Sequence, residues 1–105
     1  MTSKRIVFTQ TARSDLASIE NYIAENDGEA RASAVRARLD KAIENLAMMP
    51  GIGASRPYLK PGRRAFPVSP WTIYYTTLSD GIRVLRVIDG RRDLPSLFGR
   101  SKKKV

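Results

Sequence analysis

Residues 71–88 read WTIYYTTLSDGIRVLRVI and contain the strongest structural signal of the chain. Both of its halves are rich in β-branched and aromatic residues, which are typical of strands. Between them, Ser79-Asp80-Gly81 supplies residue types that favour a tight turn. The sequence therefore predicts a β-hairpin.

The second strand of this hairpin, residues 82–88, carries apolar residues on both faces. Strict alternation puts Val84 and Ile88 on one face, with Leu85 and Val87 on the other. Apolar side chains on two faces are typical of a strand that is covered from both sides. We therefore predict that this strand is central in its sheet and that helices pack on one side of it.

Upstream of the hairpin, residues 64–68 form another short β-prone run. Glycine and proline punctuate residues 51–62, so this segment cannot be helical and contains at most an edge segment at 56–59. A third β-prone run, residues 5–9, lies near the N-terminus.

Two amphipathic helices are predicted in the first half of the chain. Apolar residues recur three or four positions apart over residues 12–23 and again over 32–46. A hydroxyl at Thr9 or Thr11 can cap the first helix, and Gly28 can end it. Since few residues connect the two helices, we expect an antiparallel helical hairpin.

The predicted order is strand, helix, helix and three strands. This order indicates an α+β fold in which a helical hairpin packs on a mostly antiparallel β-sheet. A length of 105 residues supports one compact domain with one core. We place that domain at residues 1–98 and expect residues 99–105 to form a basic, flexible tail.

The charge of the chain is distributed unevenly. Nineteen Lys and Arg residues against ten Asp and Glu residues give a net charge of +9. Residues 1–50 hold seven of each sign, so the second half carries the whole excess. A one-sided positive field attracts polyanions or acidic proteins, whereas the run of lysines at 102–104 is more typical of a solvated terminus.

The sequence contains no histidine and no cysteine. It therefore excludes disulfides, thiolate or imidazole metal sites, and Ser-His or Cys-His nucleophile pairs. The carboxylates fall mainly on polar helix faces, and no phosphate-binding glycine-rich loop is present. We expect no catalytic residue, no metal and no cofactor. The N-terminal residues lack the apolar stretch of a signal peptide, and no run could span a membrane, so the cytoplasm is the expected location.

Arginines in the second half are the candidate binding residues, because a guanidinium recognises phosphate and carboxylate groups in a bidentate manner. Two alternatives stay open: Arg91 can pair with a neighbouring aspartate, and Arg92 can cap a turn. The aromatic residues among the arginines could stack on bases, but core packing is the favoured interpretation. The candidate set is Arg56, Arg64, Arg83, Arg86, Arg91 and Arg92.

Taken in order, these motifs resemble the RelE/ParE toxin superfamily, and its ParE branch most closely, over about residues 6–98. The hydrophobic strand that ends in Gly-Arg-Arg-Asp is the most specific part. The matching segments are Val7-Phe8-Thr9, Ala12, Asp15-Leu16, Ile19, Tyr22-Ile23-Ala24, Leu46, Pro50, Gly53, Arg56, Phe66-Pro67-Val68, Ile73-Tyr74-Tyr75 and residues 84–93, VLRVIDGRRD.

The resemblance implies a toxin of a type II toxin–antitoxin system, a class that includes plasmid stabilisation proteins. Such a toxin is neutralised by an acidic antitoxin that is encoded next to it. ParE toxins poison DNA gyrase and trap its cleaved-DNA complex, whereas RelE-type relatives cut mRNA in the ribosome. The six candidate arginines would then engage gyrase or a nucleic acid.

The residues favour the ParE interpretation. RelE-type ribonucleases carry an arginine where this chain has Thr72, and a tyrosine where it has Phe98, which cannot transfer a proton. One residue points the other way, because Asp89 stands where ParE-like sequences often have histidine. We therefore expect a toxin that binds gyrase and is not an enzyme. The alternatives are a ribosome-dependent mRNA endonuclease, with Arg92 as a phosphate ligand, and a basic binding module without toxicity.

Overall fold

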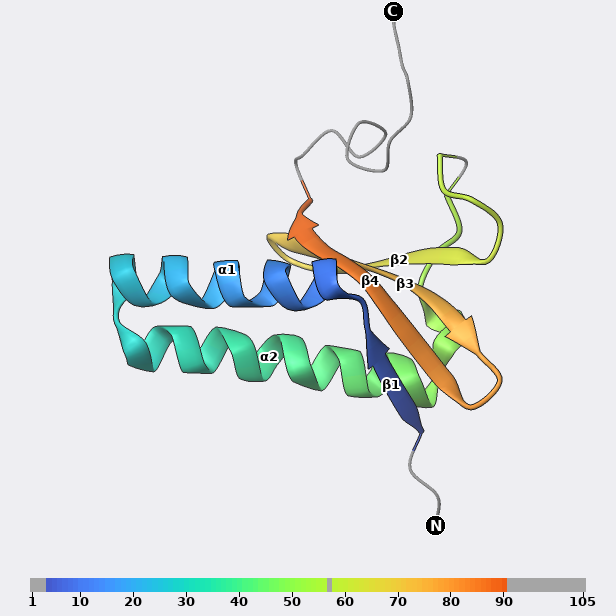
Figure 1. Ribbon diagram of the computed structural model, residues 1–105, viewed down its shortest axis with the longest axis horizontal. Coiled ribbons are helices and arrows are strands. Elements are labelled where there is room, and N and C mark those ends of the chain that lie inside the picture. The colour runs from blue at the N-terminus through green and yellow to red at the C-terminus, as the bar shows by residue number, and fades with distance from the viewer. Residues whose placement is uncertain (1–3, 57, 91–105) are drawn as a thin grey trace, which may run out of the picture.

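The computed structural model describes residues 4–56 and 58–90. Two helices lie between the first strand and the last three strands, in the predicted order (Figure 1). The α+β fold class is thereby confirmed. The elements are β1 (Arg5–Phe8), α1 (Gln10–Asp27), α2 (Glu29–Met48), a 3₁₀ turn (Pro50–Ile52), β2 (Arg63–Val68), β3 (Trp71–Leu78) and β4 (Gly81–Asp89).

The four strands form one mixed sheet in the order β1-β4-β3-β2. The β3–β4 and β2–β3 pairs are antiparallel, and β1 runs parallel to β4. The prediction that β4 is central is therefore confirmed. Gly81 is required at the start of β4, because a Cβ atom there would lie 1.8 Å from the carbonyl oxygen of Arg5.

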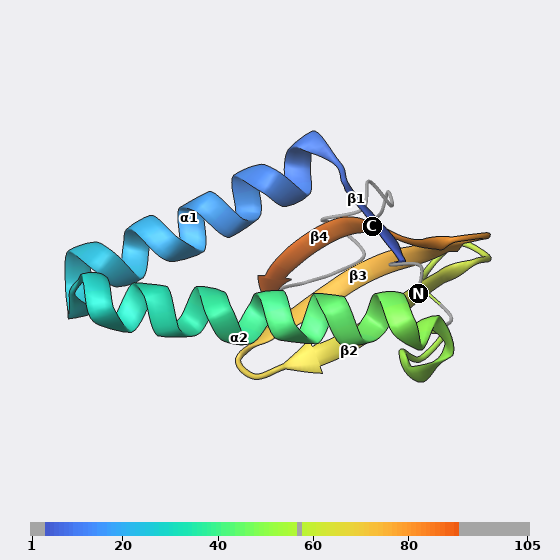
Figure 2. The ribbon, with the colours of Figure 1, turned by 90° about the horizontal axis from the view of Figure 1, so that it is seen from below.

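The helices form the predicted antiparallel hairpin and cover one face of the sheet (Figure 2). The Thr9 hydroxyl caps α1 by accepting a hydrogen bond of 3.0 Å from the Ala12 N–H. Gly28 alone connects the helices, and its φ of 95° is a conformation that glycine adopts without strain. The joined end of the hairpin reaches past the strands (Figure 1).

β4 contains a β-bulge at Leu85. Tyr75 pairs with Val84, whereas its neighbour Tyr74 pairs with Arg86, so Leu85 has no residue opposite it. A bulge of this kind inserts one residue and interrupts the alternation of side chains between the two faces.

The predicted faces of β4 are wrong because of this bulge. Val84 and Val87 both belong to the core under the helices, whereas Leu85 and Ile88 lie with a small cluster on the opposite face. We call that opposite side, away from the helices, the outer face. Its cluster is formed by Ala65, Tyr74 and Ile88, with Tyr58, Leu59 and Leu85 packed against them.

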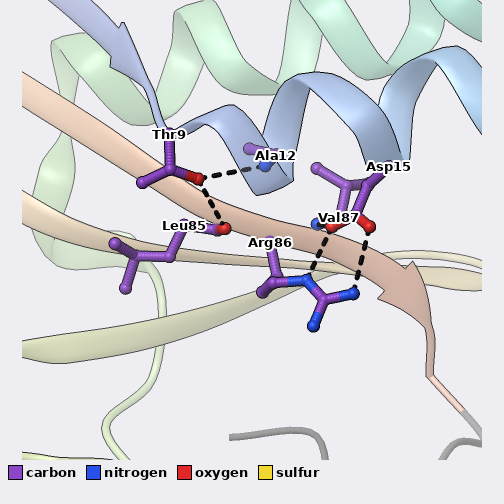
Figure 3. A network of polar contacts seen from close by, with 6 residues as sticks. All are labelled: Thr9, Ala12, Asp15, Leu85, Arg86 and Val87. Carbon is purple, nitrogen blue, oxygen red and sulfur yellow. Dashed lines mark hydrogen bonds and ion pairs between the residues drawn. The ribbon is translucent and has the colours of Figure 1, made fainter.

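Among residues 4–56 and 58–90, the edge of β4 beyond Val84 has no strand partner, because β1 ends at Phe8. The start of α1 takes the place of that partner (Figure 3). The Thr9 hydroxyl donates to the carbonyl oxygen of Leu85 at 2.9 Å. The Asp15 carboxylate accepts from the Val87 N–H at 2.9 Å.

Asp15 also binds the side chain of Arg86. The guanidinium donates to both carboxylate oxygens, from Nε at 2.8 Å and from Nη2 at 3.0 Å (Figure 3). This hydrogen bonding raises the pKa of Arg86. The two side chains are only 21% and 13% exposed, for Arg86 and Asp15 respectively, so water screens the pair weakly.

Replacing Asp15 should destabilise the protein strongly. Asp15→Ala removes the acceptor of the Val87 N–H and leaves the Arg86 guanidinium without its partner. We expect the free energy of unfolding to fall by about 3 kcal/mol, as for other ion pairs that are largely buried. Urea denaturation followed by circular dichroism measures this change.

Asp80 provides the matched control, because it forms an exposed ion pair with Arg5 at 3.0 Å. We expect Asp80→Ala to cost less than about 1 kcal/mol. Equal losses for the two variants would contradict the role that we assign to Asp15.

Candidate functional site

Of the six candidate arginines, the four that the structure describes do not gather on one surface. Arg83 is exposed on the outer face of β4. Arg86 is held by Asp15, so its guanidinium is already engaged within the chain. Arg91 and Arg92 lie outside the described residues, and their role stays a prediction.

Arg64 lies near the 3₁₀ turn. Its Nη1 donates to the carbonyl oxygen of Gly53 at 2.7 Å. Beside it, the Tyr75 hydroxyl donates to the carbonyl oxygen of Pro50 at 2.6 Å and accepts from the Gly53 N–H at 2.9 Å. Arg64 therefore helps to hold this loop against the sheet.

The outer face carries a different pair of arginines. Thr76 of β3 stands opposite Arg63 of β2 on one side and opposite Arg83 of β4 on the other. Residues in register on neighbouring strands share a face, so these three form one row across the sheet. Arg63 was not among the six candidate arginines predicted from the sequence. The alternation of β2 could have separated it from Arg64, because adjacent strand residues point to opposite faces.

Two cations on the preceding loop border this row. Lys60 is exposed, and its carbonyl oxygen accepts from the Arg63 N–H at 3.1 Å, so a tight turn brings the two residues together. The positive charge of Arg56 acts on the hydroxyl of Tyr74 in the outer-face cluster. We call these residues the basic face: Arg56, Lys60, Arg63 and Arg83. The sequence has no Asp or Glu between Glu44 and Asp80 to offset their charge.

The buried tyrosine of the outer-face cluster, Tyr74, does not supply a base at neutral pH. Burial raises the pKa of Tyr74 to about 12, and the neighbouring Tyr58 hydroxyl acts in the same direction, first through its charge and then through a hydrogen bond that favours the protonated form of Tyr74. The Tyr74 hydroxyl therefore keeps its proton and cannot act as a general base. Within residues 4–56 and 58–90, no group of three or more carboxylates is placed to hold a metal ion.

A groove lies on the other side of the sheet, between the helical hairpin and the ends of β3 and β4. Its volume is about 620 Å³. The apolar lining residues are Ile19, Tyr22, Ile23, Val35, Pro70, Trp71, Val87 and Ile88, and the charged ones are Asp15, Asp27, Arg31, Arg86 and Asp89. Tyr22 is 67% exposed, which is unusual for an aromatic residue on an amphipathic helix.

The groove was not predicted from the sequence. Tyr22 precedes the buried Ile23 and lies outside the apolar stripe of α1. An aromatic residue outside the apolar stripe was the one sequence feature that could have indicated the groove. Trp71 is held at the groove by Arg38, whose guanidinium carbon lies 5.9 Å from the ring centroid.

Neither of the described helices is long and apolar enough to cross a membrane.

Comparison with known proteins agrees with this geometry. Residues 6–94 match the family described as "ParE toxin of type II toxin-antitoxin system, parDE". The chain is 32% identical to Toxin ParE3 of Caulobacter vibrioides over 96 residues, which cover 91% of this chain and 96% of that relative.

A solved structure shares the fold. The structure titled "Chromosomal ParDE TA system from P. aeruginosa" superposes with a TM-score of 0.70 at 22% sequence identity. The match covers 82% of this chain and 95% of that one. From the family match over residues 6–94 and the identity to Toxin ParE3, we conclude that this chain belongs to the ParE toxin family of type II toxin–antitoxin systems.

Proposed function

We propose that the protein inhibits DNA gyrase by binding it and trapping the cleaved-DNA complex. The observation that carries this proposal is the basic face, which presents arginines beside a cluster whose buried tyrosine offers no general base. Such a surface can hold a target electrostatically. Gyrase acts on DNA in the cytoplasm, which is where we expect this toxin to act.

The main alternative is an mRNA endonuclease of the RelE type. Such an enzyme needs groups that accept and donate protons at the reacting phosphate. The chain has no histidine, and Tyr74 keeps its proton at neutral pH. A nuclease would have to rely on arginines alone to stabilise charge in the transition state. These features favour binding over cleavage.

A supercoiling assay tests the proposal. We expect purified protein at micromolar concentration to inhibit supercoiling by gyrase and to increase the fraction of cleaved DNA. Arg83→Glu reverses one charge on the basic face and should weaken inhibition by about tenfold. Lys41→Glu is the control, because Lys41 is exposed on α2 and should leave inhibition unchanged.

Two results would decide against gyrase. Normal supercoiling without any trapped cleavage complex would overturn the proposal. Cleavage of translated mRNA at defined codon positions, detected by primer extension, would replace it with the nuclease alternative.

We further propose that the groove binds a segment of the acidic antitoxin encoded next to this toxin. Exposed Tyr22 and partly buried Trp71 offer apolar surface, and its removal from water on binding a partner is favourable. Arg31 is exposed at the groove and can pair with a carboxylate of the antitoxin. An aromatic anchor beside an arginine is typical of residues that dominate binding energy.

Substitution of Tyr22 tests this site. Since Tyr22 is largely exposed, Tyr22→Ala should preserve the fold but weaken antitoxin binding at least about tenfold in calorimetry. Met48 is the matched control, because it is a similarly exposed apolar residue that does not line the groove. Equal affinities of Tyr22→Ala and the unmodified toxin would place the antitoxin elsewhere.

A further inference from the structure

We propose that the basic face binds the phosphate backbone of duplex DNA directly, through Arg63 and Arg83 with support from Lys60. This inference goes beyond the proposed function, because the contact requires no gyrase. The toxin would then bind DNA by itself, independently of any protein target.

The geometry of the row suits a phosphate backbone. Arg63 and Arg83 lie on β2 and β4, in register with Thr76 on the strand between them. Two strand spacings separate their backbones, which amounts to about 10 Å. Flexible arginine side chains at this separation can reach phosphates of nearby nucleotides on one strand.

Thr76 keeps the space between the two arginines open. Its side chain is small, and its hydroxyl donates to the carbonyl oxygen of Gly62 at 3.0 Å. The hydroxyl is therefore held down against the loop. Phosphate oxygens can approach both guanidinium groups from solvent without displacing a bulky side chain between them.

The guanidinium groups of the row are available for a ligand. Each of the ion pairs found within residues 4–56 and 58–90 involves another arginine: Arg5, Arg36 or Arg86. Arg83 is exposed and Arg63 is partly exposed. Lys60 adds a third positive charge beside the row. The carboxylate of Asp80, at the β3–β4 turn, is already paired with Arg5 and so does not neutralise the row.

The composition of the outer face favours duplex DNA over other anionic partners. Proteins that bind single-stranded nucleic acids stack bases on exposed aromatic rings. Here Tyr74 is only 1% exposed, and Tyr58 packs against it in the cluster. An acidic protein would also seek apolar contacts, whereas the row itself is polar and the apolar side chains beside it, Val7, Leu78 and Leu85, are all partly buried. Phosphate contacts alone are sufficient for sequence-independent binding to a duplex.

Fluorescence anisotropy of the purified full chain with a labelled DNA duplex tests the proposal. The dissociation constant is measured without gyrase at several salt concentrations between about 50 and 200 mM. We expect Arg63→Gln and Arg83→Gln each to weaken binding roughly 5- to 10-fold and to reduce the slope of log affinity against log salt by about 1. The double variant should lose about 2 from the slope.

Lys41→Gln is the matched control, because it removes one positive charge from an exposed position on α2. It should change the affinity less than about twofold. Circular dichroism of each variant establishes that the fold is retained. An equal loss for Lys41→Gln would show that only net charge matters, and would overturn the proposal.

Three further outcomes would also overturn it. The first is no duplex binding at the lowest salt concentration. The second is tighter binding of single-stranded DNA or RNA than of the duplex. The third is displacement of the duplex by a polyglutamate peptide at equal charge concentration, which would assign the face to an acidic protein. Since gyrase is absent, none of these results decides whether the protein inhibits supercoiling.

Discussion

The carboxylate of Asp15 meets three donors of β4, and the arrangement of helices and sheet depends on this contact. β1 is too short to pair with the second half of β4, so the backbone there needs other partners. Thr9 and Asp15 supply them from the first turns of α1. The same contact fixes α1 across the edge of the sheet, and from there the helical hairpin extends beyond the strands (Figure 2). The groove lies where that overhang begins, between the hairpin and the ends of β3 and β4.

The bulge at Leu85 makes this contact possible. It shifts β4 by one residue, so that Val87 turns its side chain to the helices while its N–H meets Asp15. Arg86 comes to the edge of β4 next to the same carboxylate. The sequence alone suggested that Arg86 was available to bind a target, but its guanidinium stabilises the fold instead. Ile88, in turn, moves to the outer face and helps to close the small cluster there.

Local chemistry made most of the fold predictable from the sequence. The hairpin, both helices and the Thr9 cap depend on residues close to one another along the chain, where propensity and periodicity apply. The bulge was not predictable, because strict alternation is the only rule that a single strand supplies. The Asp15–Arg86 pair joins residues 71 positions apart, so no local pattern contains it. The groove was not predictable for the same reason, since its two sides come from segments that are distant in the sequence.

The proposed antitoxin and DNA surfaces lie on opposite sides of the same sheet. A segment in the groove would touch the end of β4 near Val87, while Arg83 remains open on the outer face. Steric exclusion alone would then not keep the toxin from DNA. An acidic antitoxin can still weaken the basic face electrostatically, because the field of its carboxylates extends over about one Debye length, near 10 Å at 0.1 M salt. Neutralisation by this route depends on ionic strength, whereas neutralisation by steric cover does not. The salt dependence with which the antitoxin neutralises DNA binding by the toxin therefore distinguishes the electrostatic mechanism from the steric one.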